Sequence, residues 1–185
     1  MLSRLRVPMT RALSSTSGVP WNQLTHVNKE GTTPCMVDVS SKPATRRAAT
    51  ARSTVRFPPA VLAAIQQGDS AKTSVLSSSK GPIITTAVIA GILGAKQTSA
   101  LLPFCHPLSL ENCHVRLDVR EPDAIDIECH VQVTHKTGVE MEALTGASVA
   151  ALCVYDMCKA LSHEIVIEQT RLVHKTGGKR DVEAL

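Results

Sequence analysis

Strict alternation of side-chain character from Thr45 to Phe57 is the feature that most limits the folds open to this chain. Small or apolar residues alternate there with polar or charged ones, the latter being Thr50, Arg52, Thr54 and Arg56. Because successive side chains of a β-strand point to opposite faces of its sheet, this pattern predicts a strand with one buried and one charged face. The sheet would then be covered on one side only.

Other segments extend the sheet. Cys113–Arg120 and Ile125–His135 also alternate, and the Glu-Pro-Asp-Ala sequence between them is typical of a turn, so together they predict a hairpin. Glu164–Lys175 is expected to form a last strand and Met36–Ser40 a short one. The final ten residues, which contain a Gly-Gly pair, read as a flexible tail.

Three helices are expected between these strands. One begins at Pro58–Pro59 and ends at Gly68, the usual asymmetry of proline at helix starts and glycine at helix ends. Pro82–Leu102 is a second helix, and the third follows Gly138 and extends to Leu161. The serine-rich residues 69–80 suggest a surface loop, and the two prolines within Leu102–Leu110 exclude a regular helix there.

From residue 45 onward the predicted order is therefore strand, helix, strand, strand, helix, strand, with the first two helices counted as one connection. This βαββαβ order predicts an α+β, ferredoxin-like fold, in which helices cover one face of an antiparallel sheet.

Composition argues against nucleic acid as a partner. The net charge of +4 arises from residues 1–29, which hold four basic residues and no acid, so the remainder is formally neutral. The chain has one Trp, one Tyr and two Phe residues, too few to stack bases across a sheet. RNA binding is thus disfavoured.

The N-terminal residues are rich in Arg and Ser, which is typical of a mitochondrial presequence, with a disordered cytosolic tail as the alternative. We assign residues 1–19 to this segment and residues 20–185 to one catalytic domain. No apolar run reaches the roughly 18–20 residues that a membrane span needs, so no membrane partner is expected. The six cysteines form no CxxC pair and are expected to be free thiols.

The long helix carries four charges whose meaning is open. Glu140 and Glu142 in its first turn suit the helix dipole, and Asp156 and Lys159 can form a surface ion pair. However, the surrounding sequence is apolar on nearly every face, so we expect Asp156 and Lys159 to lie against packed neighbours, where charges usually mark an active site or interface. Glu142 and Asp156 are about 21 Å apart along a straight helix, so one site using both would join different subunits.

Two further features are less specific. Phe104-Cys105-His106-Pro107 places a thiol and an imidazole on an irregular segment, but the other histidines show no metal-ligand spacing, so no metal is predicted. Several lysines adjoin glycine, a combination that suits phosphate, although each could equally be a solvated loop residue. The phosphate-binding motifs GxxxxGK[ST] and GxGxxG are missing.

Four segments together carry a family resemblance. They are Leu24–Ala48, Ala90–Leu110 (AGILGAKQTSALLPFCHPLSL), Lys136–Ala160 (KTGVEMEALTGASVAALCVYDMCKA) and Arg171–Lys179 (RLVHKTGGK). In this order they resemble the cyclic pyranopterin monophosphate synthases of molybdenum cofactor synthesis. The resemblance implies a ferredoxin-like fold, a homohexamer (a trimer of dimers) with sites between subunits, and no redox cofactor.

The resemblance also implies a reaction: a pyrophosphate-releasing cyclase of the phosphorus–oxygen lyase type acting on (8S)-3',8-cyclo-7,8-dihydroguanosine 5'-triphosphate. Asp156 matches the catalytic aspartate, Lys159 its lysine partner and Lys80 the loop lysine. The implied substrate-binding residues are Phe104, Cys105, His106, Glu140, Met141, Glu142, Arg47 and Lys175. Asp, Glu, His and Lys can carry the protons that ring rearrangement moves, and cations can balance phosphate charge.

The chain departs from the family pattern near Lys80. About eight extra residues separate Gly68 from the second helix, so that Lys72 keeps the spacing from Gly68 and Lys80 keeps the spacing to the helix. We favour Lys80, because the helix fixes its position. Pro82 and Val88 replace the usual Asp and Arg, and Phe104 replaces Leu.

Two other classes of function compete with the enzyme. A noncatalytic regulator on the same frame would bind nucleotide phosphates without releasing pyrophosphate, and a buried Asp156 would argue against it. A Cys/His metal protein would contain stoichiometric metal.

Overall fold

The computed structural model describes residues 26–28, 32–67 and 76–183, and the chain divides into two units, Met1–Val37 and Asp38–Leu185. In the first unit Val27 and Pro34 form an isolated bridge, and the Asn28 side chain accepts hydrogen bonds from the backbone N–H groups of Thr32 and Thr33. The second unit contains all the described helices and the sheet.

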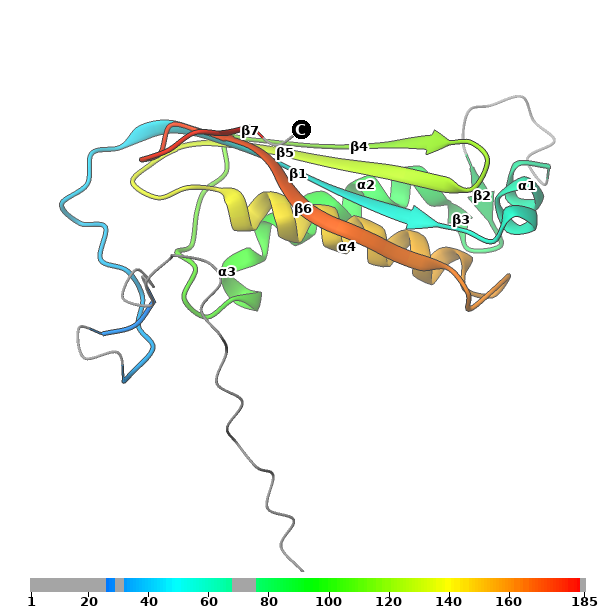
Figure 1. Ribbon diagram of the computed structural model, residues 1–185, viewed down its shortest axis with the longest axis horizontal. Helices are drawn as coiled ribbons and strands as arrows, with labels where there is room; N and C mark the ends of the chain where they lie inside the picture. Colours follow the sequence, from blue (N-terminus) through cyan, green and yellow to red (C-terminus); the bar gives the residue numbers. More distant parts are fainter. Residues whose placement is uncertain (1–25, 29–31, 68–75, 184–185) are drawn as a thin grey trace, which may run out of the picture. The chain divides into compact units, whose positions relative to one another are not determined.

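The second unit has the predicted fold. Its strands are β1 (Thr45–Arg56), β2 (Ser77–Ser78), β3 (Gly81–Pro82), β4 (Asn112–Arg120), β5 (Ala124–His135), β6 (Val166–Thr176) and β7 (Val182–Glu183), and its helices are α1 (Pro59–Gln67), α2 (Ile83–Lys96), α3 (Thr98–Leu101) and α4 (Glu140–Cys158). The main sheet has the order β4-β5-β1-β6-β7 with antiparallel neighbours. Figure 1 shows α2 and α4 against one face of this sheet. The ferredoxin-like α+β prediction is therefore confirmed.

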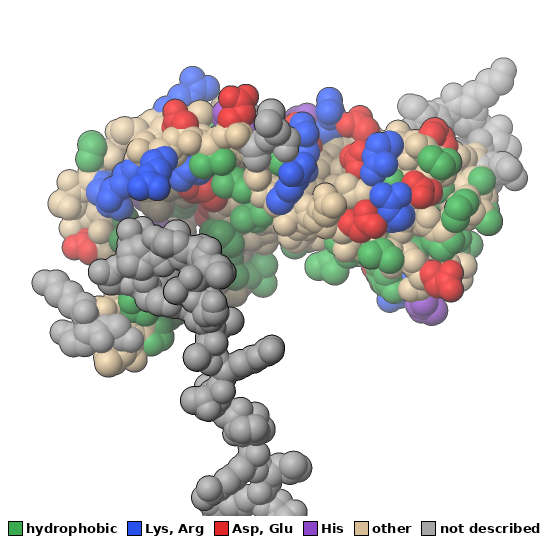
Figure 2. Space-filling model, viewed as in Figure 1, with side chains coloured by type: hydrophobic (Ala, Val, Ile, Leu, Met, Phe, Trp, Pro, Cys, Tyr) green, Lys and Arg blue, Asp and Glu red, His purple; other side chains and the backbone are tan. Residues whose placement is uncertain are grey.

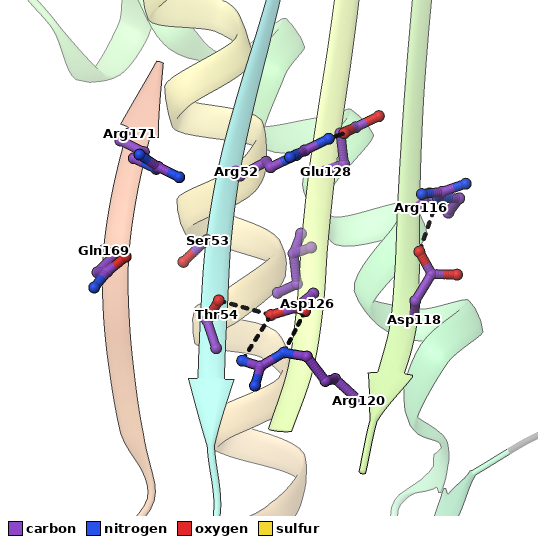
Figure 3. Close-up of a pocket in the computed structure, with 11 residues that line it drawn as sticks. Arg52, Ser53, Thr54, Arg116, Asp118, Arg120, Asp126, Glu128, Gln169 and Arg171 are labelled. Carbon is purple, nitrogen blue, oxygen red and sulfur yellow. Dashed lines mark hydrogen bonds and ion pairs between the residues drawn. The ribbon is translucent and has the colours of Figure 1, made fainter. Parts of the chain in front are cut away.

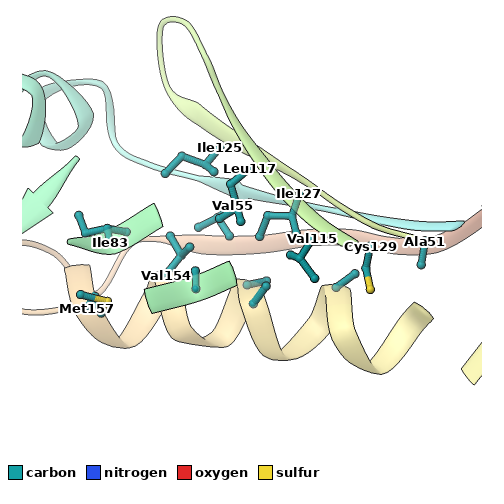
Figure 4. Close-up of a cluster of buried hydrophobic side chains, with 14 of the residues drawn as sticks. Ala51, Val55, Ile83, Val115, Leu117, Ile125, Ile127, Cys129, Val154 and Met157 are labelled. Atoms are coloured by element: carbon teal, nitrogen blue, oxygen red, sulfur yellow. The ribbon is translucent and has the colours of Figure 1, made fainter. Parts of the chain in front are cut away.

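The core lies between the sheet and α4 (Figure 4). Ala49, Ala51 and Val55 of β1 are fully buried, as the alternation predicts, and Ile125, Ile127 and Val131 of β5 join them. The two helices approach closely because they meet at glycines. A Cβ atom on Gly94 of α2 would lie 2.7 Å from Val149 of α4, and one on Gly146 of α4 would lie 2.5 Å from Sγ of Cys129 on β5, so α4 lies close to both α2 and the sheet. This tight contact fixes α4, and with it the charged ends of α4.

Several local predictions were wrong. Met36–Ser40 forms no strand, because its backbone turns at Ser40, where the Ser40 N–H donates to Asp38 Oδ1 and Lys42 N–H to Val39 O. Within the expected serine-rich loop, Ser77–Ser78 pairs with Gly81–Pro82. The expected C-terminal tail contributes β7, which pairs with β6. Strands of two residues are too short to show an alternating pattern in the sequence.

One more expectation needs correction. By length and composition α4 is apolar enough to cross a membrane, although the sequence had suggested no such segment. Half of that stretch is buried inside the unit, where it contacts α2, β1, β5 and β6. These contacts are those of a core helix.

Candidate active site

The first candidate cluster lies at the C-terminal end of α4. Asp156 is in the last turn and Lys159 follows the helix, while Lys80 occupies the turn between β2 and β3, next to Gly81 with its positive φ of 112°. Lys159 Nζ lies 2.7 Å from Asp156 Oδ1, and Lys80 Nζ lies 2.8 Å from Asp156 Oδ2. Lys80 also donates to the Asp156 carbonyl oxygen at 2.8 Å. One carboxylate thus holds two ammonium groups.

The expectation that Asp156 and Lys159 are packed among buried neighbours is wrong. Their side chains are 55% and 47% exposed, because α4 buries Val154, Met157 and Cys158 against the core and turns Asp156 outward. The apolar residues that suggested burial on all faces include Leu152, which is itself 58% exposed. The hydrogen bonds from Lys159 and Lys80 lower the pKa of Asp156 to about 2, so the carboxylate is ionised at neutral pH.

The second candidate cluster lies at the N-terminal end of α4. Lys175 Nζ of β6 lies 2.7 Å from Glu140 Oε1, and Lys175 pairs across the sheet with Ala49 of β1. On β1, Arg47 is held by two carbonyl groups, with Nε 2.9 Å from His135 O and Nη2 3.2 Å from Lys136 O. Burial opposes ionisation of Glu140, but the hydrogen bond from Lys175 prevails and its pKa lies below the ordinary value.

Glu142 has a contrasting environment. It is 4% exposed, and burial raises its pKa to about 7, with a further contribution from the charge of Glu140. Two carboxyl groups in one helical turn therefore have pKa values shifted in opposite directions, which is a common arrangement for acid–base catalysis. Near neutral pH Glu142 can accept or donate a proton.

The irregular segment Leu102–Leu110 reaches the same end of α4. Burial raises the pKa of the Cys105 thiol, and the negative charge of Glu142 raises it further. Phe104 and His106 flank it and are half-buried. Met141 is 39% exposed on the first turn of α4. The structure thus gathers Arg47, Cys105, Glu140, Glu142 and Lys175 at one end of the helix.

The two clusters do not meet within one chain. Glu142 and Asp156 are fourteen positions apart on one continuous helix, a rise of about 21 Å. Lys72, the alternative loop lysine, lies outside the described residues, whereas Lys80 contacts Asp156. Among the residues that the structure describes, no three His, Cys, Asp or Glu side chains are grouped closely enough to hold a metal ion.

A hollow of about 310 Å³ on the uncovered face of the sheet is a separate feature (Figure 3). Three ion pairs line it, Arg52 with Glu128, Arg116 with Asp118 and Arg120 with Asp126, and Arg171 is a fourth arginine in the lining. In Figure 2, too, Lys and Arg side chains are interspersed with Asp and Glu. Carboxylates pair with at least three of the four arginines of the hollow, which leaves little excess positive charge to select a polyanion.

Comparison with known proteins decides the family. The model of the MoaC family matches residues 36–178, a range that includes both clusters. The chain belongs to the MoaC family. The resemblance noted in the sequence is thereby confirmed.

Relatives of this MoaC chain match it over most of its length. The cyclic pyranopterin monophosphate synthase of Xanthomonas oryzae pv. oryzae is 55% identical over 88% of this chain and 94% of its own length. That of Desulfitobacterium hafniense is 48% identical over 85% and 91%. The molybdenum cofactor biosynthesis protein 1 of Dictyostelium discoideum is 42% identical over 85% of this chain but 27% of its own length.

Sequence reasoning missed His135 in this MoaC chain. The residue was assigned to the end of a strand and to no site, yet its carbonyl oxygen helps to hold Arg47. The available signal was strand alternation, which places His135 on the same face as Val131 and Val133.

Proposed function

We propose that this chain is a cyclic pyranopterin monophosphate synthase, which converts (8S)-3',8-cyclo-7,8-dihydroguanosine 5'-triphosphate to cyclic pyranopterin monophosphate and diphosphate in molybdenum cofactor biosynthesis. The observation that carries the proposal is the 55% identity to a synthase of that name over 94% of the latter's length. The geometry supports it, because Lys80 and Lys159 both form ion pairs with Asp156, although Lys80 is 76 residues from Asp156 in the sequence.

The arrangement fits the chemistry in outline. To close the cyclic phosphate, a hydroxyl oxygen of the substrate bonds to the phosphorus nearest the nucleoside, and the bond from that phosphorus to diphosphate breaks. The hydroxyl proton needs an acceptor, and Glu142, with a pKa of about 7, is suited to accept and return protons. Lys80, Lys159, Arg47 and Lys175 supply positive charge for the phosphate oxygens.

A single-turnover assay tests the proposal. Wild-type protein is mixed with freshly generated cyclic dihydroguanosine triphosphate, and diphosphate and cyclic pyranopterin monophosphate are followed together. Stoichiometric formation of both products is expected. Binding of the substrate without diphosphate release would support the regulator instead. Because Asp156 is exposed, it no longer argues against a regulator, but the buried Glu142 does, since a phosphate-binding module gains nothing from a proton-transfer group.

We infer that the complete site forms between two copies of the chain, in a homo-oligomer that the family resemblance suggests is a hexamer. Each copy has Glu142 at one end of α4 and Asp156 at the other, so two antiparallel copies would bring the two clusters together twice. The outer face of the helix layer suits such a contact, because Ile89, Leu93 and Leu152 are 63%, 55% and 58% exposed. Large apolar side chains grouped on one surface typically mark an interface.

Replacement of Leu152 by Asp is expected to lower the oligomeric mass and the activity together, because it places a charge in this interface. Native mass spectrometry and the turnover assay measure the two effects. Val182→Asp is the control, since Val182 is also partly exposed but lies on β7 at the edge of the sheet. Unchanged mass for Leu152→Asp would place the interface elsewhere.

The N-terminal Arg- and Ser-rich segment leads us to propose a mitochondrial location. Residues 1–24 fused to a fluorescent protein are expected to direct it to mitochondria, and replacement of Arg4, Arg6 and Arg11 by Asp should abolish this. Diffuse cytosolic fluorescence of the unaltered fusion would contradict the proposal.

A further inference from the structure

His135 is the last residue of β5 and faces the helix layer. Alternation along β5 puts it on the same side as the buried residues Val131 and Val133. Val133 is the cross-strand partner of Arg47, and Ala49, the partner of Lys175, is two residues further along β1. Arg47, Lys175 and His135 therefore share one face at one end of the sheet, in successive rows about 7 Å apart.

The imidazole of His135 has an unusual feature. Its Nδ1 atom is buried, yet it has no hydrogen-bond partner. Among the residues that the structure describes, every other buried side-chain nitrogen or oxygen has one. Leaving a buried polar atom unpaired costs about 1–3 kcal/mol, so proteins normally pair it with protein, water or ligand. The carbonyl oxygen of the same residue already accepts a hydrogen bond from Arg47 Nε at 2.9 Å.

We propose that His135 is a further substrate-binding residue, whose Nδ1–H donates a hydrogen bond to a phosphate oxygen of the substrate held by Arg47 and Lys175. Lys175 and Glu140 balance each other in one ion pair. Arg47, and Lys136 with its ammonium group on the Ser40 carbonyl oxygen, are the further positive charges at this end of the sheet, and they favour an anion. Identification of the anion as the substrate rests on the proposed function, whereas binding of phosphate groups at His135 does not.

The chemistry of the imidazole allows a test at a single atom. An Asn side chain places its amide close to the position of Nδ1, whereas a Gln side chain reaches the position of Nε2. His135→Asn is therefore expected to keep the hydrogen bond, and His135→Gln and His135→Ala to lose it. A merely structural role for the ring would not distinguish Asn from Gln in this way.

The first measurement is calorimetric binding of diphosphate to full-length wild type and variants. His135→Gln is expected to weaken diphosphate binding roughly tenfold, as befits one hydrogen bond to a charged group, and His135→Asn less than about threefold. His114→Gln is the matched control, because His114 is exposed on the opposite face of the sheet and should bind like wild type. Guanosine, which has no phosphate, should bind equally to all of them.

Turnover separates this inference from the proposed function. If wild type is active, His135→Gln should raise KM with little change in kcat, and His135→Asn should restore KM. Wild type that binds diphosphate through His135 but forms no product would overturn the proposed function and keep the phosphate contact. Equal diphosphate binding by wild type, His135→Gln and His135→Ala would overturn the inference and indicate an internal water at Nδ1.

Discussion

Replacement of Glu142 by Gln is expected to abolish turnover and, at the same time, to stabilise the folded protein above pH 7. Burial raises the pKa of Glu142 from 4.5 to about 7, so ionisation of this carboxyl opposes folding. A carboxyl whose pKa is higher in the folded protein than in the unfolded chain stabilises the fold fully only at a pH below its pKa in the unfolded chain. This stabilisation is lost as the pH rises through the pKa of the carboxyl in the folded protein. The shift corresponds to about 3 kcal/mol at most, and Gln removes that penalty.

Urea unfolding at pH 5 and pH 8 measures the effect. Wild type should lose stability between these values relative to Glu142→Gln, whose free energy of unfolding should depend less on pH. Glu140→Gln is the control in the same helical turn, because the pKa of Glu140 is shifted downward and its ion pair with Lys175 is lost. That variant should be less stable than wild type at pH 8. Parallel pH profiles for wild type and Glu142→Gln would contradict the assignment.

Replacement of Asp156 by Asn is expected to lower diphosphate release at least 100-fold without unfolding the protein, within the range that loss of a proton-transfer or orienting group usually gives. The carboxylate joins Lys80 and Lys159, and a neutral amide would leave the two ammonium groups without the charge that orients them. Because Asp156 is half-exposed, the thermal unfolding temperature should change little.

Asp118→Asn provides the matched control. Asp118 also forms an exposed ion pair, in its case with Arg116, but both residues lie on β4 and belong to neither cluster. This control should keep wild-type turnover. Substantial activity in Asp156→Asn would remove Asp156 from the catalytic group.

The same variant also tests whether the site is shared between two subunits. Co-expression of Asp156→Asn with Glu142→Gln should restore about a quarter of the wild-type activity, because about half of the dimers are then mixed and each mixed dimer has one intact site of two.

The agreement between prediction and structure differs from one region to the next. Alternation identified β1, β4 and β5, since a two-residue period matches the geometry of a strand buried on one side and does not match the 3.6-residue period of a helix. The expected burial of Asp156 failed because an apolar surrounding sequence does not distinguish a core helix from one whose outer face is exposed. Leu152 shows this, since it is apolar and yet 58% exposed.

The sequence by itself determined the order of strands and helices, the family and the residue types available at the site, because these depend on local periodicity and on motifs. Only the tertiary structure decided which groups meet: Lys80 with Asp156, Lys175 with Glu140, and Arg47 with the carbonyl of His135. It also decided that burial raises the pKa of Glu142 while two lysines lower the pKa of Asp156, although both are carboxyl groups on one helix. The physical reason is that pKa values and hydrogen bonds depend on burial and on partners distant in the chain, which local sequence patterns do not encode.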